Sequence, residues 1–441
     1  MAQSEEFCFI IINQQGKSFM STIKPFCSVL YNKEKVGDPQ RVMAPPYDVI
    51  SEELQAQLQA RSPYNFTHID LIKDVPEDND QKTKYDRASD IFQKWLQDEV
   101  MVQDSEPAIY VYRQEYTIMG QKHNRLGFVA AMALEDEGDS RVRPHEKTHD
   151  HHASDRLELT KALDANLSPI FVCYSDTHRK VEKIYTQQLS GQEPLFDVTG
   201  TDGVRNKVWR VTDKAEIEDI NRSLTGQQLF IADGHHRYRV AQEYRQLCKE
   251  KAGENYDPDA AYNYVMTYFT NLDSRDLQIF PMHRIVPKIS KSLDFLEDIF
   301  RIDRISSKEE LPILLAKAGL NEHAFALYTK EGMKLLRLKN KLMIEERIKE
   351  GSVDFKHLDA TILKNFVFDQ LGIEPKDIIY TKDQEECFQM VDEGKADASF
   401  IMNAVRIQQL KAIALNGERM PQKTTYFFPK VMSGLTVYKM D

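Results

Sequence analysis

The sequence predicts a mixed α/β protein, because apolar segments of strand length alternate with amphipathic segments of helix length. Residues 108–118 and 127–135 are rich in aromatic and β-branched side chains, which is typical of β-strands. Residues 85–96 have the apolar spacing of an amphipathic helix. Ser51 is the expected N-cap of another helix, and Glu53 in its first turn favours the helix dipole.

The composition excludes several classes of protein. With 441 residues, of which 41% are hydrophobic, the chain is long enough for two domains and too apolar for wholesale disorder. No apolar run approaches the ~18–20 residues that cross a bilayer, and residues 7–12 are too short for a signal peptide. Five scattered cysteines without a CxxC pair exclude a disulfide framework and indicate a reducing cytoplasm. The net charge of −11 disfavours nucleic acid as a partner.

The composition of the sequence changes twice along the chain, and each change predicts a domain boundary. Residues 1–19 are interpreted as an N-terminal extension, with Met20 as the alternative start of the native chain. Residues 20–286 carry most of the strand-like segments and are expected to form an N-terminal α/β domain. Residues 287–441 are richer in Lys/Glu-rich helical segments and are expected to form a helix-rich C-terminal α/β domain.

The segment IADGHHRYRV is the most informative part of the chain. An apolar strand ends at Asp233, Gly234 permits a tight turn, and the next helix opens with His235, His236 and Arg237. Free N–H groups at a helix N-terminus bind anions, and these side chains add donors for phosphate oxygens. The alternative is a helix cap with surface histidines. Because the crowded cationic groups repel one another without an anion, we interpret the segment as a phosphate cradle.

Glu146 in the segment RPHEKT is the candidate general base. It lies among Arg141, Arg143, His145 and Lys147, and such cations lower the pKa of a carboxylate and keep it ionised. The alternative is a solvated charged loop.

The same segment also matches the H-E-x-x-H pattern of zinc proteases. That pattern needs a helix that places both histidines on one face. Pro144 precedes it and polar residues follow it, so residues 143–155 are expected to form a loop and no metal site is predicted. His149, His151 and His152 are expected to lie in a flexible flap.

Other polar groups follow strand-like segments. Lys423, Thr424 and Thr425 offer one cation and two hydroxyl groups as an anion clamp, although an edge strand would also explain them. Arg284 ends an apolar strand in the segment PMHR, where its role is open between structure and binding. The segment APPYD is a rigid turn that would aim Tyr47 and Asp48 into a cleft, unless it serves only as a turn.

Seven segments in order resemble the DUF1015 family, over the chain from about Lys24 to Leu435. They are APPYDVI, NFTHIDL, RPHEKT, DRLELTKALDANLSPIF, IADGHHR, LQIFPMHR and MPQKTTYFFPK. The order of PHE, DGHHR and P-x-K-T-T is also similar to that of the archaeal ADP-dependent free-serine kinases of the ParB/sulfiredoxin-like superfamily.

The narrower resemblance implies a ParB/sulfiredoxin-like phosphate-binding core with inserted strands. It implies Glu146 as the base on a substrate hydroxyl, and the DGHHR residues from Asp233 to Arg237 as the phosphate cradle. Two departures are visible: Tyr426 and Phe427 replace an Arg-His pair that helps hold the kinases' amino-acid substrate, and a long insertion separates Glu146 from Asp233.

Together these patterns predict a cytoplasmic phosphotransferase that uses ADP or ATP with Mg²⁺. The acceptor would be the hydroxyl of a small metabolite such as serine, with no nucleic-acid or membrane partner. Lys423 or Arg237 would balance developing charge, and Glu146, His236 and Arg237 are the expected catalytic residues. A non-catalytic nucleotide or phosphometabolite sensor and a phosphate-ester hydrolase are the alternatives. The residues expected to contact the substrate are Tyr47, Asp48, Arg143, Arg284 and Tyr426.

Overall fold

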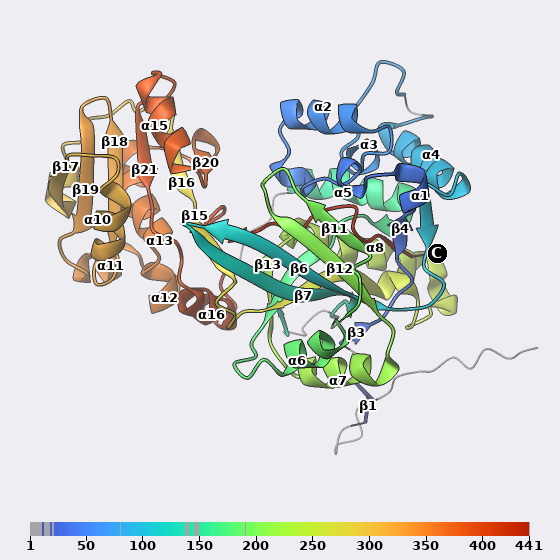
Figure 1. Ribbon diagram of the computed structural model, residues 1–441. Helices are drawn as coiled ribbons and strands as arrows, with labels where there is room; N and C mark the ends of the chain where they lie inside the picture. Colours follow the sequence, from blue (N-terminus) through green and yellow to red (C-terminus); the bar gives the residue numbers. More distant parts are fainter. Residues whose placement is uncertain are drawn as a thin grey trace, which may run out of the picture. The chain divides into compact units, whose positions relative to one another are not determined.

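The structure is a computed structural model that describes residues 11–12, 18–19, 22–79, 81–136, 141–144, 150–189 and 191–440 (Figure 1). The chain forms two compact units. The first contains residues 1–142, 148–277 and 429–441, and the second contains residues 143–147 and 278–428. The last residues of the chain therefore belong to the first unit.

The first unit is built on one mixed sheet. Within the described residues this sheet has nine strands in the order β11-β12-β6-β7-β14-β10-β13-β8, with β3 beside β7. β10 and β14 are parallel, and the other pairs from β11 to β13 are antiparallel. The strands are β3 (Ile23–Lys24), β6 (Ile109–Ile118), β7 (Gln121–Ala133), β8 (Val142–Arg143), β10 (Ile170–Tyr174), β11 (Phe196–Thr199), β12 (Arg205–Val211), β13 (Leu229–Asp233) and β14 (Tyr264–Asn271).

Helices of the first unit begin where the sequence supplies caps. The hydroxyl of Ser51 accepts a hydrogen bond from the N–H of Leu54 and caps α2, which confirms the predicted cap. Thr83 and Asp86 form a capping box at the start of α4. The helices are α1 (Lys33–Val36), α2 (Glu52–Arg61), α3 (Thr67–Asp70), α4 (Lys84–Gln97), α5 (Asp150–Leu163), α6 (Lys180–Gln188), α7 (Lys214–Leu224) and α8 (His235–Ala252), with the short turn η2 (Tyr47–Val49) before α2.

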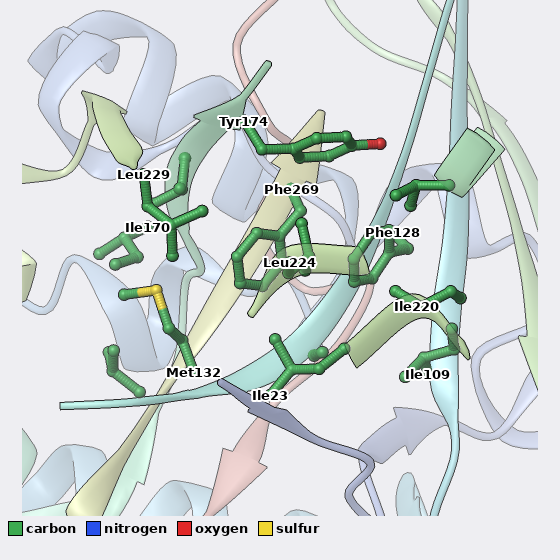
Figure 2. Packing of buried hydrophobic residues seen from close by; sticks show 14 of the residues in the cluster. Ile23, Ile109, Phe128, Met132, Ile170, Tyr174, Ile220, Leu224, Leu229 and Phe269 are labelled. Atoms are coloured by element: carbon green, nitrogen blue, oxygen red, sulfur yellow. The ribbon is translucent and has the colours of Figure 1, made fainter. Parts of the chain in front are cut away.

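The main core of the first unit lies between this sheet and helices α6 and α7. Ile220 and Leu224 of α7 pack with Ile170, Phe128 and Phe269 of the sheet (Figure 2). These five side chains are fully buried. Because burial of one large apolar side chain contributes ~1.5–3 kcal/mol, such packing outweighs local helix propensity.

The second unit has a sheet of its own, with apolar clusters on both faces. Its six described strands have the order β17-β19-β18-β21-β16-β20. These strands are β16 (His283–Val286), β17 (Phe300–Ile305), β18 (Ala324–Thr329), β19 (Gly332–Leu338), β20 (Ile379–Thr381) and β21 (Ala398–Ile401). The helices are α9 (Leu296–Ile299), α10 (Leu311–Ala318), α11 (Leu342–Arg347), α12 (Val353–Lys356), α13 (Asp359–Leu363), α14 (Asp369–Leu371), α15 (Gln384–Asp392) and α16 (Ile407–Leu415).

Four short strand pairs complete the described structure. They are β1 (Ile11–Ile12) with β2 (Ser18–Phe19), β4 (Val29–Tyr31) with β5 (Met101–Gln103), β9 (Ala165–Asn166) with β23 (Tyr438–Lys439), and β15 (Gln278–Pro281) with β22 (Thr425–Phe428). The pair of β9 with β23 ties the end of the chain to the first unit.

The mixed α/β prediction is confirmed, and one local prediction is wrong. The loop expected over residues 143–155 extends too far, because α5 starts at Asp150 and packs against α4 and α8. In α8, Val240 near the start of the helix is buried, whereas Leu247 in its later part is 41% exposed. No helix in the described ranges is long and apolar enough to cross a membrane.

Candidate functional site

The DGHHR segment forms the turn between β13 and α8. Gly234 has φ +85° and ψ 28°, a left-handed conformation that glycine adopts at little cost. A Cβ atom at this position would also lie 3.1 Å from the guanidinium group of Arg237. Among the described residues, no side chain caps the start of α8, and its first turn contains no acidic residue. The positive end of this long helix therefore has no acidic side chain of its own.

Asp233 holds two cations at the start of α8. One carboxylate oxygen accepts a hydrogen bond from Nη2 of Arg237 at 2.9 Å, and the other accepts one from Nζ of Lys430 at 2.7 Å. Burial alone would raise the pKa of Asp233, but Lys430 and Arg237 outweigh burial and hold that pKa well below its usual range. Two cations thus share one carboxylate. This surplus of positive charge and the helix dipole together favour an anion at the start of α8.

Lys430 reaches Asp233 because the last part of the chain is tied to the sheet. Nη2 of Arg125, on β7, donates to the carbonyl oxygen of Pro429 at 2.5 Å. The side-chain amide of Gln114, on β6, donates to the carbonyl oxygen of Lys430 at 2.9 Å. Arg125 is fully buried. Two neighbouring strands therefore fix the backbone that carries Lys430.

A narrow pocket lies beside the first turns of α8. Its polar lining consists of Tyr47, Asp70, Arg156, Thr160, Asn166, Ser168 and Arg237. Its volume of about 50 Å³ has room for a few water molecules or one oxyanion group. Side chains from α5, α8 and β14, together with Ala165 and Leu167 at and after β9, make the apolar part of the lining. They include Leu159, Val240, Ala241 and Val265.

Arg156 of α5 is held in this pocket by carboxylates on two sides. Its Nη1 lies 2.6 Å from the carbonyl oxygen and 3.3 Å from the carboxylate Oδ1 of Asp70. Its Nη2 and Nε donate to Oδ2 of Asp155 at 2.8 and 3.1 Å. The Tyr47 ring covers the guanidinium group, with its centroid 4.4 Å from the guanidinium carbon, which is a cation–π contact. Ser168 donates to the other carboxylate oxygen of Asp70 at 3.3 Å.

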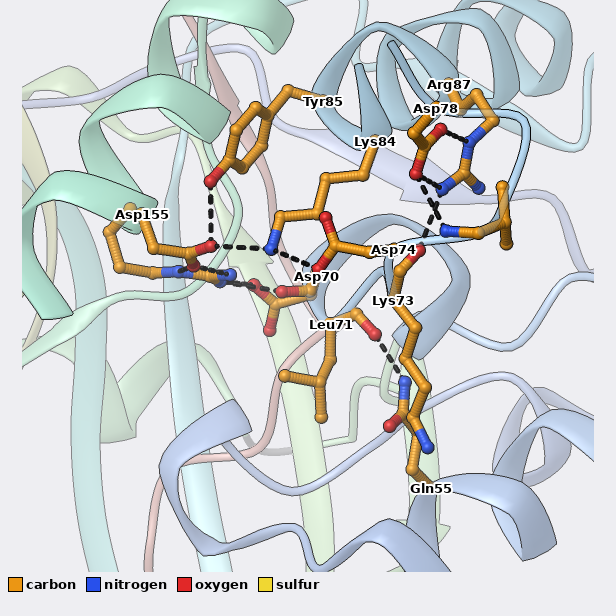
Figure 3. Close-up of polar contacts among 12 residues, drawn as sticks. Gln55, Asp70, Leu71, Lys73, Asp74, Asp78, Lys84, Tyr85, Arg87 and Asp155 are labelled. Carbon is orange, nitrogen blue, oxygen red and sulfur yellow. Dashed lines mark hydrogen bonds and ion pairs between the residues drawn. The ribbon is translucent and has the colours of Figure 1, made fainter.

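Asp155 is itself fixed by residues of α4 (Figure 3). Nζ of Lys84 lies 3.2 Å from Asp155 and 3.2 Å from Asp74. The hydroxyl of Tyr85 donates to Asp155 at 2.9 Å. Burial opposes ionisation of Asp155, but Arg156 and these partners lower its pKa to about 2. Through Asp155, these contacts help to hold Arg156 in place.

Burial raises the pKa values of both acidic groups that line the pocket, Asp70 and Tyr47. Burial raises the pKa of the Asp70 carboxyl group, although Arg156 and Arg237 act in the opposite direction. Burial also raises the pKa of Tyr47 to about 12, against the effect of Arg237. Tyr47 therefore keeps its proton at neutral pH and is available as a hydrogen-bond donor.

In the second unit, the KTT segment forms the turn before β22. Lys423 is exposed and has φ +51°, in the left-handed region. Thr424 is buried, and its hydroxyl donates to the carbonyl oxygen of Pro421 within the same turn. Thr425 begins β22 opposite Pro281. The exposed cation of this turn is therefore Lys423.

The remaining residues expected to contact the substrate lie in different settings. Tyr426 faces Phe280 across the β15–β22 pair, with Nζ of Lys382 4.9 Å from its ring centroid. Arg284 is buried on β16. Arg143 ends β8.

Of the residues singled out from the sequence, Tyr47, Asp233 and Arg237 come together in the first unit. Asp48 is exposed on the turn η2, next to Tyr47. Glu146, like His145 and His149 of the H-E-x-x-H pattern, lies outside the described residues. Within the part of the chain that is described, no group of three or more His, Cys, Asp or Glu side chains is placed to hold a metal ion.

Sequence reasoning missed four polar groups of this region: Asp70, Arg156, Ser168 and Lys430. The sequence around two of them, Asp70 and Arg156, contains a pattern from which a buried charge could have been predicted. Asp70 stands among buried residues in NFTHIDL, and Arg156 lies three residues before the buried Leu159 in DRLEL. A charged side chain that is buried beside apolar residues is costly without a partner of opposite charge. Each of these two positions therefore indicates that a residue of opposite charge, from elsewhere in the chain, lies beside it in the fold.

A comparison with protein-family models matches residues 23–361 to DUF1015, described as a family of proteins of unknown function. This match spans more than half of the chain. The chain belongs to the DUF1015 family, as its seven segments predict. A comparison with curated proteins gives no match.

Solved structures similar to this chain include a free serine kinase in complex with AMP. It is 15% identical, with a TM-score of 0.33, and the match covers 68% of this chain and 86% of that chain. A conserved hypothetical protein from Pyrococcus furiosus has 15% identity and a TM-score of 0.33, with 70% and 95% covered. SbnI with a C-terminal truncation, from Staphylococcus aureus, has 10% identity and a TM-score of 0.36, with 70% and 87% covered. At these values the likeness carries no argument about activity.

Proposed function

We propose that this protein transfers a phosphoryl group from ADP or ATP to the hydroxyl of a small metabolite such as free serine. The observation that carries the proposal is the start of α8, where Arg237 and Lys430 share the carboxylate of Asp233 at the positive end of a helix. The order of the PHE, DGHHR and KTT segments, which resembles that of the free-serine kinases, also supports it.

In this proposal the nucleotide phosphates bind over the first turn of α8. Its backbone N–H groups and Arg237 donate to phosphate oxygens, and Lys430 balances the charge that develops on the transferring group. Phosphoryl transfer depends mainly on such positioning and charge neutralisation. His236, on the first turn of α8, is a further donor to the phosphates.

Mg²⁺ would enter with the nucleotide, because it binds phosphate oxygens and usually keeps several water ligands. When bound, it neutralises charge on the phosphates. Both carboxylate oxygens of Asp233 already accept bonds from cations. Asp48 is exposed and interacts electrostatically with Arg237, so it offers the carboxylate that would hold a hydrated Mg²⁺.

Glu146 is the proposed general base, a role that rests on the sequence. Glu146→Gln should leave nucleotide affinity unchanged and lower turnover by ~10²–10⁴, the usual contribution of a general base. Unchanged turnover would move the role to Asp48, since the carboxylate of Asp233 is already bonded on both oxygens.

The proposal is tested by incubating the full chain with Mg²⁺, ADP or ATP, and hydroxylated metabolites. Phosphorus NMR then identifies the products. A phosphorylated hydroxyl compound supports the proposal, and its identity gives the acceptor. Release of free phosphate alone indicates a phosphate-ester hydrolase. Nucleotide binding without any turnover indicates a sensor.

A further inference from the structure

Arg125 of β7 places a positive charge in the interior of the first unit. Its side chain is fully buried, and its guanidinium carbon lies 4.7 Å from the ring centroid of Phe171 and 5.5 Å from that of Tyr268. Its Nη2 donates to the side-chain oxygen of Gln114 and to the carbonyl oxygen of Pro429, which are both neutral acceptors. Its Nε and Nη1 are buried and have no hydrogen-bond partner among the described residues.

No carboxylate in the described part of the chain forms an ion pair with Arg125. The carboxylate of Asp233 is bonded to Arg237 and Lys430 instead. A buried cation without a counter-charge is strongly unfavourable, and the faces of aromatic rings offset only part of that cost. A water molecule would accept from the two N–H groups without neutralising the charge. The charge itself is balanced only by an anion.

A β-bulge brings Asp233 to the face of the sheet on which Arg125 lies. The pairing of β10 with β13 shifts by one residue between Phe171 and Val172, so that Asp233 lies opposite Phe171. Residues directly opposite each other in an antiparallel pair share one face of the sheet. Without the bulge, Asp233 would share the face of Ile231, in the core against α6 and α7. The bulge therefore places Asp233 beside the ring that covers Arg125.

The backbone of Pro429 and Lys430 connects Arg125 to the start of α8. Arg125 donates to the carbonyl oxygen of Pro429, and the next residue, Lys430, donates through Nζ to Asp233 at 2.7 Å. The side-chain amide of Gln114 accepts from Arg125 and donates to the carbonyl oxygen of Lys430 at 2.9 Å. Arg125 thus fixes the segment that carries Lys430 and adds its own charge to the cations at the α8 turn.

We propose that Arg125 is a positioning residue for a diphosphate or triphosphate group bound at the start of α8. This inference rests on the function proposed above and adds a residue to its phosphate site. Arg125 acts by holding Pro429 and Lys430 in place and by attracting the ligand through the low-dielectric interior. A diphosphate or triphosphate is the matching ligand class, because each added negative charge is attracted by every fixed cation.

The test measures binding of inorganic pyrophosphate to the full chain by isothermal calorimetry at low ionic strength. Arg125→Gln keeps an N–H donor but loses the charge, and Arg125→Met loses both. Each should bind pyrophosphate at least about tenfold more weakly, because two unit charges about 10 Å apart at an effective dielectric constant of about 20 interact by that factor. Arg125→Lys keeps the charge and should stay within about threefold of the wild type.

Arg113→Met is the matched control and should bind pyrophosphate like the wild type. The guanidinium carbon of Arg113 lies 5.0 Å from the ring centroid of Trp209, so this arginine also stacks on an aromatic ring of the same sheet. It has a carboxylate nearby, since its Nη1 is 3.9 Å from Glu115. It precedes Gln114 on β6 and therefore faces the other side of the sheet from Arg125.

The outcomes separate the charge from the backbone contact. Wild-type affinity in Arg125→Gln and Arg125→Met overturns the inference, as does an equal loss in Arg113→Met. Tight binding by Arg125→Gln with weak binding by Arg125→Lys overturns the role of the charge and leaves only a backbone anchor. Urea denaturation checks the fold of each variant, and if Arg125→Met does not fold, the Gln and Lys variants decide.

Failure of this inference is distinguishable from failure of the proposed function. If the wild type binds ADP and pyrophosphate and the Arg125 variants bind them equally well, only the role of Arg125 is wrong. If the wild type binds neither ligand, the phosphate site at α8 and the proposed phosphoryl transfer are both wrong.

Discussion

Helices α4 and α8 of the first unit begin in opposite ways. α4 starts with a capping box, in which Thr83 and Asp86 satisfy each other's backbone groups. α8 starts at Gly234, with no side-chain cap and no acid in its first turn among the described residues. The start of α4 is closed by its own side chains, whereas the start of α8 has no such closure among the described residues, as the proposed phosphate cradle requires. This contrast makes α4 the natural control for every test of α8.

The largest expected effect comes from removing the shared carboxylate. Asp233→Ala leaves the largely buried Arg237 and Lys430 without their common partner, which should lower the free energy of unfolding by ~3–5 kcal/mol. Urea denaturation measures this change. Asp86→Ala is the control, because Asp86 is exposed and caps its helix locally; its cost should be clearly smaller. Equal costs would show that the α8 cluster is not a buried charge network.

A smaller effect is expected for nucleotide binding when the guanidinium group is removed. Arg237→Ala should weaken nucleotide binding by ~1–3 kcal/mol, the scale of a lost charge-assisted hydrogen bond. Isothermal calorimetry at constant salt measures it. Arg87→Ala, in the early part of α4 and paired with Asp78, should leave affinity unchanged. Wild-type affinity in the Arg237 variant would remove the main support for the phosphate cradle.

The two helix starts should also respond differently to loss of their caps. Thr83→Ala should cost ~0.5–2 kcal/mol of stability without changing nucleotide affinity, because it removes only a capping bond. Gly234→Ala should cost ~1–2 kcal/mol, because φ is +85°, and should also weaken binding by pushing on Arg237. Thermal unfolding and calorimetry on the same samples separate the two effects. If Gly234→Ala binds nucleotide as tightly as the wild type, the Gly234 turn is not part of the nucleotide site.

The smallest expected effect is a difference in acid sensitivity. The pKa of Asp233 is lower in the folded chain than its unfolded value of about 3.9. Its ionised form therefore stabilises the fold above that value, and this contribution is lost as the pH falls further towards the folded pKa. Urea midpoints at pH 7, 4 and 2.5 should decline more steeply in wild type than in Asp233→Asn. If the urea midpoints of the two proteins decline in parallel as the pH falls, the lowered pKa assigned to Asp233 is wrong.

Much of the site near α8 could be predicted from the sequence, because its parts are neighbours along the chain. Asp233, Gly234 and Arg237 fall within one turn, so their juxtaposition follows from a strand, a glycine and a helix start. The cap at Ser51 was predictable for the same reason. The loop expected over residues 143–155 was wrong because contacts of α5 with α4 and α8 stabilise a helix whose sequence lacks a strong apolar stripe.

The sequence by itself determined the mixed α/β class, the family and the strand-glycine-helix turn at Asp233, since each depends on local spacing or on segments in order. Only the tertiary structure decided which distant charges meet there. Lys430 reaches Asp233 across 197 positions of sequence, and Arg156 reaches Asp70 across 86. No local pattern specifies such pairs, because burial makes an unpaired charge costly but leaves the choice of partner to the packing of strands and helices.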